Sequence, residues 1–243
     1  MILWSLLSSV STAVAQFGGV DMSFKPGFDN EVFTIRVQPD GKVLASGFFT
    51  KVGNSSRSGV ARINADGSVD TMFNPGTGAS TTNGLPHTVD TLVLQRDGRV
   101  ILGGRFQKFN NVTRSYLARL NSDGSLDGAY TPVVDDIVVA LALQPDGKLL
   151  IGGEFFTVNG TPRSHIARLN TDGTLDTDFD PGSGLDASPQ AFAVQTNGAV
   201  IIGGQFTSVN GVTRVRVARL MMTDGSVDST FDVGAGPDAG GVN

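Results

Sequence analysis

Two hydrophobic patterns follow one another along the chain. In the first, apolar and polar residues alternate, as where Ile35 and Val37 flank Arg36, and a period of two is that of a strand with one buried face. In the second, apolar residues run on without a break, as at residues 43–45, which indicates a strand covered on both faces. No segment shows the 3.6-residue period of an amphipathic helix. The pattern therefore predicts an all-β chain.

Both patterns recur along the sequence. A turn of the form Gln-x-Asp/Asn-Gly appears four times, and a second landmark, Ala-Arg-Ile/Leu, appears four times with the same offsets of 57, 49 and 51 residues. The turn glycines are Gly41, Gly98, Gly147 and Gly198. Two landmarks that move together indicate four tandem repeats.

Each repeat contains four strand signals separated by turns. The alternating strand comes first, the continuous apolar strand follows the Gln-x-Asp-Gly turn, the third strand ends in Ala-Arg-Ile/Leu, and the fourth follows an Asp-Gly turn. The fourth strand ends on an aromatic residue in every repeat: Phe73, Tyr130, Phe179 and Phe231. Four short antiparallel strands per repeat form the blade of a β-propeller, whereas the coils of a β-helix are far shorter than these repeats. We therefore predict a β-propeller of four tandem four-stranded antiparallel blades.

The repeats place four units at about residues 31–76, 88–133, 137–182 and 188–234. Residues 20–27 match the fourth-strand segment 175–182 of the third unit, so we expect a lone fourth strand at residues 19–27. The repeat domain as a whole spans residues 16–243. Because no unit looks able to stand without neighbours, and the lone strand lacks a unit of its own, we expect a partial, open ring.

The first residues have the pattern of a secretory leader. An apolar stretch ends in Ala13-Val14-Ala15, the small-x-small pattern after which a signal peptidase cleaves. The stretch is shorter than the roughly 20 apolar residues of a membrane span. We therefore predict a signal peptide at residues 1–15, a secreted or cell-surface location, and no insertion into a membrane.

Composition excludes several chemistries. The chain has no cysteine, so it has neither disulfides nor thiolate metal sites nor cysteine nucleophiles. Its net charge is -5, with no basic face to neutralise a phosphate backbone, which argues against a nucleic-acid partner.

The repeat motif resembles a known family. Residues 138–155, with the core A-L-A-L-Q-P-D-G-K-L-L-I-G-G-E-F, continue through V-N-G-x-P-R and A-R-L-N-T-D-G-T-L-D-T-D-F-D-P-G at residues 158–182. This pattern resembles the delta-60 repeat family of bacterial, commonly exported proteins with propeller-like repeats. The resemblance covers residues 19–234 and implies a surface or secreted location but no defined reaction. One departure, Met221-Met222 in place of a single Asn, predicts a bulge in the last unit.

Charged residues that recur in all four units are expected to serve the blade, because a catalytic site needs one asymmetric constellation. We expect them to form ion pairs or turn caps, since a charge kept beside an apolar core is normally paired. They are Arg62, Arg119, Arg168 and Arg219, with Asp70, Asp127, Asp176 and Asp228. The same reasoning covers Arg57, Arg114, Arg163 and Arg214. Glycine pairs such as Gly152-Gly153 lie at expected strand ends and precede no helix, so we interpret them as structural and not as phosphate-binding loops.

Metal and histidine chemistry find little support in the spacing. Asp176, Asp178 and Asp180 alternate along an expected strand, so they would share a face and bind Ca²⁺ together with a loop, although turn capping is the favoured interpretation. No other cofactor is predicted. His87 and His165 occupy different repeat positions and have no partner at motif spacing, so we expect both to be solvated.

No motif of a hydrolase, nucleotide-binding loop or zinc protease is present. We therefore predict that the chain is not an enzyme but an extracellular repeat scaffold whose loops bind a protein or a glycan. The loop at residues 75–88 is the longest, and we expect contacts from Asn83, Leu85 and His87. Two alternatives remain open: a propeller-type metal-dependent hydrolase or lactonase with its metal in the central channel, and a purely structural spacer of a larger surface protein.

Overall fold

A computed structural model describes residues 21–231 and 234, and every regular element in that part of the chain is a β-strand. The predicted signal peptide lies outside the described residues. Within them, no helix is long and apolar enough to cross a lipid bilayer. The all-β prediction is confirmed.

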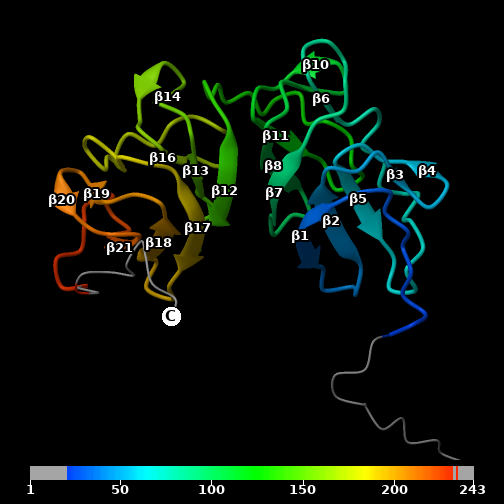
Figure 1. Cartoon of the computed structure of the whole chain (residues 1–243), viewed down its shortest axis with the longest axis horizontal. Coiled ribbons are helices and arrows are strands. Elements are labelled where there is room, and N and C mark those ends of the chain that lie inside the picture. Colours follow the sequence, from blue (N-terminus) through cyan, green and yellow to red (C-terminus); the bar gives the residue numbers. More distant parts are fainter. Residues whose placement is uncertain (1–20, 232–233, 235–243) are drawn as a thin grey trace, which may run out of the picture.

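Each of the four units holds one antiparallel three-stranded sheet (Figure 1). The sheets of units 1 and 2 are β1 (Val32–Val37), β2 (Val43–Gly47) and β5 (Val60–Ile63), then β7 (Val89–Leu94), β8 (Val100–Gly104) and β11 (Leu117–Leu120). Those of units 3 and 4 are β12 (Val138–Leu143), β13 (Leu149–Gly153) and β16 (Ile166–Leu169), then β17 (Pro189–Val194), β18 (Val200–Gly204) and β21 (Val217–Leu220). The second strand is central in every sheet.

Short two-residue strands form a hairpin in each unit, separate from its three-stranded sheet. The hairpins are β3 (Lys51–Val52) with β4 (Ser55–Ser56), β9 (Lys108–Phe109) with β10 (Val112–Thr113), β14 (Thr157–Val158) with β15 (Thr161–Pro162), and β19 (Ser208–Val209) with β20 (Val212–Thr213). A further strand, β6 (Ala79–Ser80), joins β9 from the loop between units 1 and 2. Asn159, in the turn between β14 and β15, has a φ of 50°, a left-handed conformation that asparagine tolerates in hairpin turns.

The fourth strand of each blade is reduced to a single antiparallel bridge to the third. The bridges are Ile63–Val69, Leu120–Leu126, Leu169–Leu175 and Leu220–Val227. One cause is visible at Asp70, whose Oδ1 accepts a hydrogen bond from the Met72 N–H at 2.9 Å. This side-chain cap turns the chain away from the sheet directly after the bridge. The four-stranded blade is therefore present with a very short outer strand.

The structure also corrects two smaller expectations, the lone fourth strand and the bulge in the last unit. Residues 21–27, the described part of the expected lone strand, form no strand, and Asp21 caps a turn at Ser23 as Asp70 does at Met72. The extra residue at Met221-Met222 does not bulge β21, whose pairing with β18 is regular. It lengthens the following turn, which is closed by a hydrogen bond from the Met221 N–H to the Ser226 carbonyl.

The hydrophobic core lies between the sheets. The central strand β8 sends Leu102 into a cluster with Leu44 of unit 1 and Ile101 into a second cluster with Ile151 of unit 3. The central strand β13 likewise sends Leu150 into a third cluster, with unit 4. A strand that contributes to two cores must be apolar on both faces, which explains the continuous apolar runs.

The four first strands surround one axis. A cavity of about 330 Å³ is lined by residues of β1, β7, β12 and β17 together, so the sheets share a radial centre as propeller blades do. Units 1 and 2 form the right half of Figure 1, and units 3 and 4 the left half. Among the described strands, β1 contacts β7, β7 contacts β12 and β12 contacts β17, with no comparable contact from β17 back to β1. The ring is open, as predicted.

Neighbouring units are joined through the repeated arginines. Each arginine donates from Nε to the repeated aspartate of its own unit, at 2.7, 2.9, 2.6 and 2.8 Å along the chain. Its guanidinium lies over the aromatic ring that ends the unit, 4.1 to 4.8 Å from the ring centre. In the first three units the arginine also donates to a turn carbonyl of the next unit, as from Arg62 Nη1 to Ser122 at 2.9 Å. The predicted pairing is present and extends across the unit boundary.

Candidate functional site

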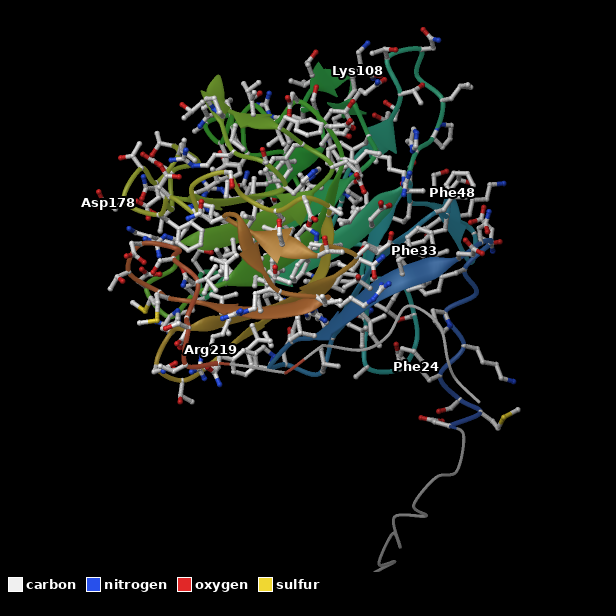
Figure 2. The ribbon with its side chains drawn as sticks, turned by 60° about the vertical axis from the view of Figure 1, so that its left-hand side comes forward. Phe24, Phe33, Phe48, Lys108, Asp178 and Arg219 are labelled. Atoms are coloured by element: carbon white, nitrogen blue, oxygen red, sulfur yellow. The ribbon has the colours of Figure 1, made fainter. Side chains whose placement is uncertain are left out.

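Side chains that differ from unit to unit occupy three equivalent positions at one end of the axis. The first is the second residue of the first strand: Phe33, Asp90, Val139 and Gln190. The next residue after the second strand is Phe48, Arg105, Glu154 and Gln205. The residue just before the third strand is Gly59, Tyr116, His165 and Arg216. Figure 2 shows Phe33 and Phe48 at this end of unit 1.

A bulge in the first strand sets the first of these positions. In every unit the pairing between the first and second strands shifts register across this residue, for example between Val138 and Ala140. A bulged residue is released from the ladder, and its side chain is aimed away from the regular alternation. The same bulge in four units presents four different side chains to the axis.

The third position is held in the left-handed backbone region. The φ angles are 66° at Tyr116, 68° at His165 and 66° at Arg216, where unit 1 has Gly59. Two backbone hydrogen bonds impose this conformation, as from the His165 N–H to the Phe155 carbonyl at 2.8 Å and from the Gly153 N–H to the His165 carbonyl at 3.1 Å. A non-glycine residue in this region costs about 1 kcal/mol or more. In three units, this unfavourable conformation is adopted by a polar residue, and the residue differs in each unit.

These positions converge on a cavity of about 380 Å³, which we call the mouth cavity. Its lining includes Arg105, Glu154, His165, Gln190 and Gln205, from units 2, 3 and 4. Val139 and Gln190 line both this cavity and the 330 Å³ channel on the axis. The mouth cavity is therefore the outer end of the channel.

His165 is buried, and the expectation that it is solvated was wrong. Its side chain and backbone leave it only 7% exposed, with Nδ1 2.9 Å from the Gly153 carbonyl oxygen and the ring 5.0 Å from that of Phe156. A carbonyl can only accept, so Nδ1 carries the hydrogen and Nε2 is the polar atom left for the cavity. The left-handed backbone conformation at His165, which no sequence motif predicts, directs this ring toward the interior.

Asp90 supplies a second buried polar group. Its Oδ2 is 3.2 Å from Arg105 Nε, and its backbone carbonyl accepts from the Thr34 hydroxyl of unit 1 at 3.2 Å. Its Oδ1 is buried and has no hydrogen-bond partner, although Asp90 lines the channel. A buried carboxylate oxygen without a partner is an exception to the rule that buried polar groups are hydrogen-bonded.

Asp186 has a structural use at the edge of the mouth cavity. Burial raises the pKa of this carboxyl, but hydrogen bonds from the Thr207 hydroxyl and from the Ser208 and Thr207 N–H groups outweigh burial and hold the pKa below its ordinary value. The backbone bonds are 2.8 Å to Thr207 and 3.0 Å to Ser208. Asp186 is thus an ionised cap of β19 and is not suited to be a proton donor near neutral pH.

The loop residues expected to make contacts lie elsewhere. Asn83 and Leu85 belong to an exposed turn closed by the Thr81 N–H and the Leu85 carbonyl at 2.8 Å, and Leu85 is 65% exposed. His87 Nδ1 accepts from the Thr88 N–H at 2.8 Å. None of the three lines the mouth cavity.

The three aspartates considered for Ca²⁺ do not come together. They lie in a turn rather than a strand, so they share no face. Asp176 is engaged by Arg168 and Lys148, Asp178 lies at the outer edge of the molecule (Figure 2), and Asp180 faces Arg163 at 3.6 Å. Within residues 21–231, no three acidic or histidine side chains are grouped as metal ligands would be.

The second set of repeated arginines is also structural. Each donates from Nη1 to the carbonyl of the residue before it, at 2.7 to 2.9 Å.

The sequence analysis did not predict the mouth cavity, although a signal for it was present. The signal is a set of positions that are equivalent in every repeat but carry a different residue in each. Hydrophobic periodicity alone does not show that such positions from three units meet.

Comparison with known proteins agrees with this architecture. The model of a domain of unknown function, the DUF5122 β-propeller, matches residues 38–73, 95–129, 144–179 and 195–231. No curated protein matches the chain. Each matched segment begins at a Gln-x-Asp/Asn-Gly turn and ends at or one residue before the aromatic that closes the unit.

Three of the solved structures that are similar to the chain are distant in sequence. Virginiamycin B lyase from Staphylococcus aureus is 16% identical with a TM-score of 0.47, covering 80% of this chain and 54% of the lyase. The WD40 β-propeller domain of Doa1 is 16% identical with a TM-score of 0.46, covering 72% and 48%. A putative gluconolactonase is 17% identical with a TM-score of 0.45, covering 80% and 66%.

The chain thus spans about half the length of the first two of these structures. Similarities at this distance carry no argument about activity. The family model is different in kind, because it matches more than half of the chain in four copies that coincide with the four units. The chain belongs to the DUF5122 β-propeller family.

Proposed function

We propose that the chain is a non-catalytic binding module, secreted or at the cell surface, whose mouth cavity binds a segment of a glycan. One observation carries the proposal. Residues that repeat in every unit lie between the units, whereas six of the twelve residues at the three variable positions line one cavity. Variation at fixed positions around a rigid frame is how a repeat scaffold acquires a specific site.

The chemistry of the lining suits a polyhydroxylated ligand. The amides of Gln190 and Gln205 each offer donors and an acceptor, and Glu154 offers an acceptor, which matches hydroxyl groups that both donate and accept. Phe156 is not part of the lining, but it is 58% exposed and its ring contacts that of His165, so it offers an apolar face beside the cavity for a sugar ring. A cavity of 380 Å³ is within the size range of small-ligand sites. A protein partner would favour a larger and flatter surface.

The enzyme alternative has less support. A metal-dependent hydrolase needs several carboxylate, amide or histidine ligands that converge from different first strands. The four first-strand residues at this end of the axis include one carboxylate, Asp90, which lines the channel and is paired with Arg105. The resemblance of the repeats to exported proteins supports the extracellular location.

A glycan array with the full chain tests the proposal, followed by calorimetric titration of the oligosaccharide that binds most strongly. We expect the double variant Gln190→Ala/Gln205→Ala to bind at least about tenfold more weakly, since two hydrogen bonds are lost. The matched control is Asn83→Ala/Leu85→Ala in the exposed loop, which should bind as the parent does. Loss of binding in the loop variant alone would place the contact there, and an array without a hit would contradict a glycan ligand.

A further inference from the structure

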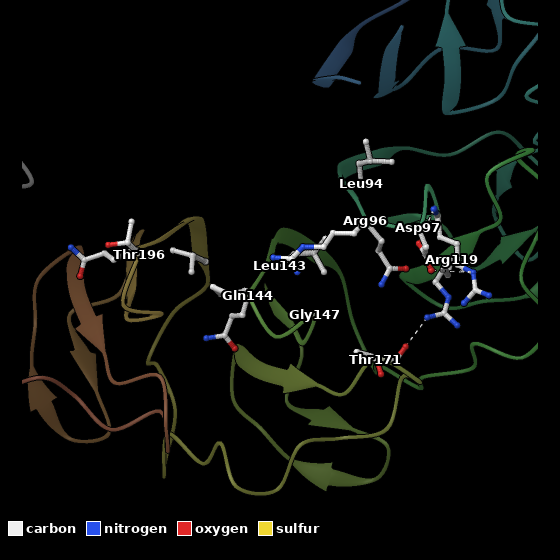
Figure 3. A pocket seen from close by; sticks show the side chains of 14 residues that line it. Leu94, Arg96, Asp97, Arg119, Leu143, Gln144, Gly147, Thr171 and Thr196 are labelled. Atoms are coloured by element: carbon white, nitrogen blue, oxygen red, sulfur yellow. Dashed lines mark hydrogen bonds and ion pairs between the residues drawn. The ribbon is translucent and has the colours of Figure 1, made fainter. Parts of the chain in front are cut away.

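The opposite end of the axis holds a larger cavity, of about 700 Å³ (Figure 3). It is lined by the turns that follow the first strands of units 2, 3 and 4. Its apolar wall is formed by the last residues of those strands, Leu94, Leu143 and Val194. The mouth cavity is lined by the second residues of two of the same strands, so the two cavities are about 13 Å apart along the axis at 3.3 Å per residue. We call this second cavity the turn cavity.

Cationic side chains border the turn cavity. Arg96, Arg99 and Arg119 line it, against one acidic residue, Asp97. The excess of positive charge is local, since the chain as a whole carries a net charge of -5. Arg119 is committed to the fold through Asp127 and the Thr171 carbonyl. Arg96 and Arg99 are the two guanidinium groups left for a ligand.

Arg96 departs from the repeat. The equivalent positions in the other units are Pro39, Pro145 and Thr196. Arg96 is exposed, and among the described residues it has no ion-pair or hydrogen-bond partner. Figure 3 shows its side chain reaching from the unit 2 turn toward the unit 3 side of the cavity. An unpaired guanidinium beside an apolar wall favours an anion that brings an apolar body with it.

Arg99 departs from the repeat in its contacts. In units 1 and 3 the equivalent residue is a lysine whose Nζ bonds the repeated aspartate at 2.8 and 2.7 Å: Lys42 to Asp70, and Lys148 to Asp176. In unit 2, Arg99 Nη1 remains 3.9 Å from Asp127, and Nε is 3.6 Å from Asp97. Neither distance is that of a hydrogen bond, so this guanidinium is only loosely held at the cavity.

We propose that the turn cavity binds a small organic anion, whose carboxylate or sulfonate is attracted by the guanidinium groups of Arg96 and Arg99 and whose apolar body lies against Leu94, Leu143 and Val194. Guanidinium groups bind such oxyanions through paired N–H donors. The volume accommodates a two-ring ligand, since ligand sites run from about 300 to 1,000 Å³. The site is separate from the mouth cavity and takes a different class of ligand.

Calorimetric titration of the full chain with naphthalene-2-sulfonate, at low ionic strength, tests this proposal. The neutral analogue 2-naphthalenemethanol should bind at least about tenfold more weakly, as should the variants Arg96→Gln and Arg99→Gln, because each loses a charge-assisted hydrogen bond. Asp97→Asn should bind the sulfonate more tightly, since it removes the competing negative charge and keeps the Oδ1 that caps the turn. Lys51→Gln, on exposed β3, is the matched control and should leave the affinity unchanged.

Three results would overturn the proposal: no heat with the sulfonate, equal affinity for the neutral analogue, or an affinity unaffected in both arginine variants. The tighter binding of Asp97→Asn cannot arise from a folding defect, so it keeps the test decisive. The mouth variant Gln190→Ala/Gln205→Ala should bind naphthalene-2-sulfonate as the parent does. Failure at one cavity is therefore distinguishable from failure at the other.

Discussion

Arg168 of unit 3 donates a hydrogen bond to the backbone carbonyl of Thr223 in unit 4, over 3.2 Å. The same guanidinium also donates to Asp176 at 2.6 Å and lies over the ring of Phe179. One side chain thus connects the outer turn of its own unit to the outer turn of the next. The packing of each blade against the next is stabilised by this repeated contact as well as by the apolar clusters between the sheets.

Replacing Arg168 by methionine should destabilise the fold. The side chain is 4% exposed, and its removal leaves a buried Asp176 with Lys148 as its remaining cationic partner. Breaking a buried pair costs about 3 kcal/mol, or a fall in Tm of roughly 6–12 °C for a chain of this size. Urea unfolding followed by circular dichroism measures the loss.

The matched control is Arg219→Met. Arg219 makes the same pair with Asp228 but is 23% exposed, and among the described residues it donates to no carbonyl of another unit. Its loss should cost about 1 kcal/mol. Equal losses in the two variants would show that the link between units contributes nothing.

Acid should weaken the equivalent contact in unit 1, between Arg62 and Asp70. Burial raises the pKa of Asp70, but hydrogen bonds from Lys42 and Arg62 outweigh burial and lower it from 3.8 to about 2. A lowered folded-state pKa contributes stability that is complete above the unfolded value and is lost as the pH falls through the folded one. The difference in unfolding free energy between the parent and Asp70→Asn should therefore be constant above about pH 5 and shrink between about pH 4 and 2. A constant difference down to pH 2 would rule out this ion pair as its source.

Arg216→Gly should stabilise the protein. Arg216 has a φ of 66°, and its buried Nε has no partner, so glycine removes backbone strain at small cost in contacts. We expect a gain of about 0.5–1 kcal/mol in urea unfolding. The reverse change in unit 1, Gly59→Ala, should destabilise, because its φ is 77° and the new Cβ would lie 2.8 Å from Val89. A loss of stability in Arg216→Gly would mean that the arginine packs better than its contacts indicate.

The paired glycines and the turn glycines are required for different physical reasons, and alanine substitutions can distinguish the two. A Cβ on Gly153 would collide with the carbonyl oxygen of Ile137, where two backbone segments cross, so Gly153→Ala should cost about 3 kcal/mol. Gly160→Ala meets no atom within 4 Å but has a φ of 76°, and it should cost about 1 kcal/mol. Urea unfolding compares the two. If Gly160→Ala were the worse variant, backbone crossing would not be the reason for the glycine pair.

Local features of the fold were predictable because local patterns carry them. The alternation at Ile35 and Val37 identifies a first strand, and the apolar run at residues 149–151 identifies a central strand covered on both sides, as the burial of Leu150 between units confirms. The outer strand is present but shorter than predicted. The sequence predicts a fourth strand that runs from the Asp-Gly turn to Phe73, but the Asp70 side chain caps the Met72 N–H and ends the ladder after Val69. Competition between a side-chain cap and a strand is not visible in hydrophobicity.

The sequence by itself determined the four units, the order of their first three strands, and the repeated positions of Arg62, Asp70 and their equivalents, because each depends on spacing within one repeat. Only the tertiary structure decided that Arg105, Glu154 and Gln190 share one cavity and that Arg96 borders another. These residues come from different units, and their distances follow from the angle at which sheets pack around the axis. That angle results from side-chain packing between sheets, which no periodicity along a single repeat encodes.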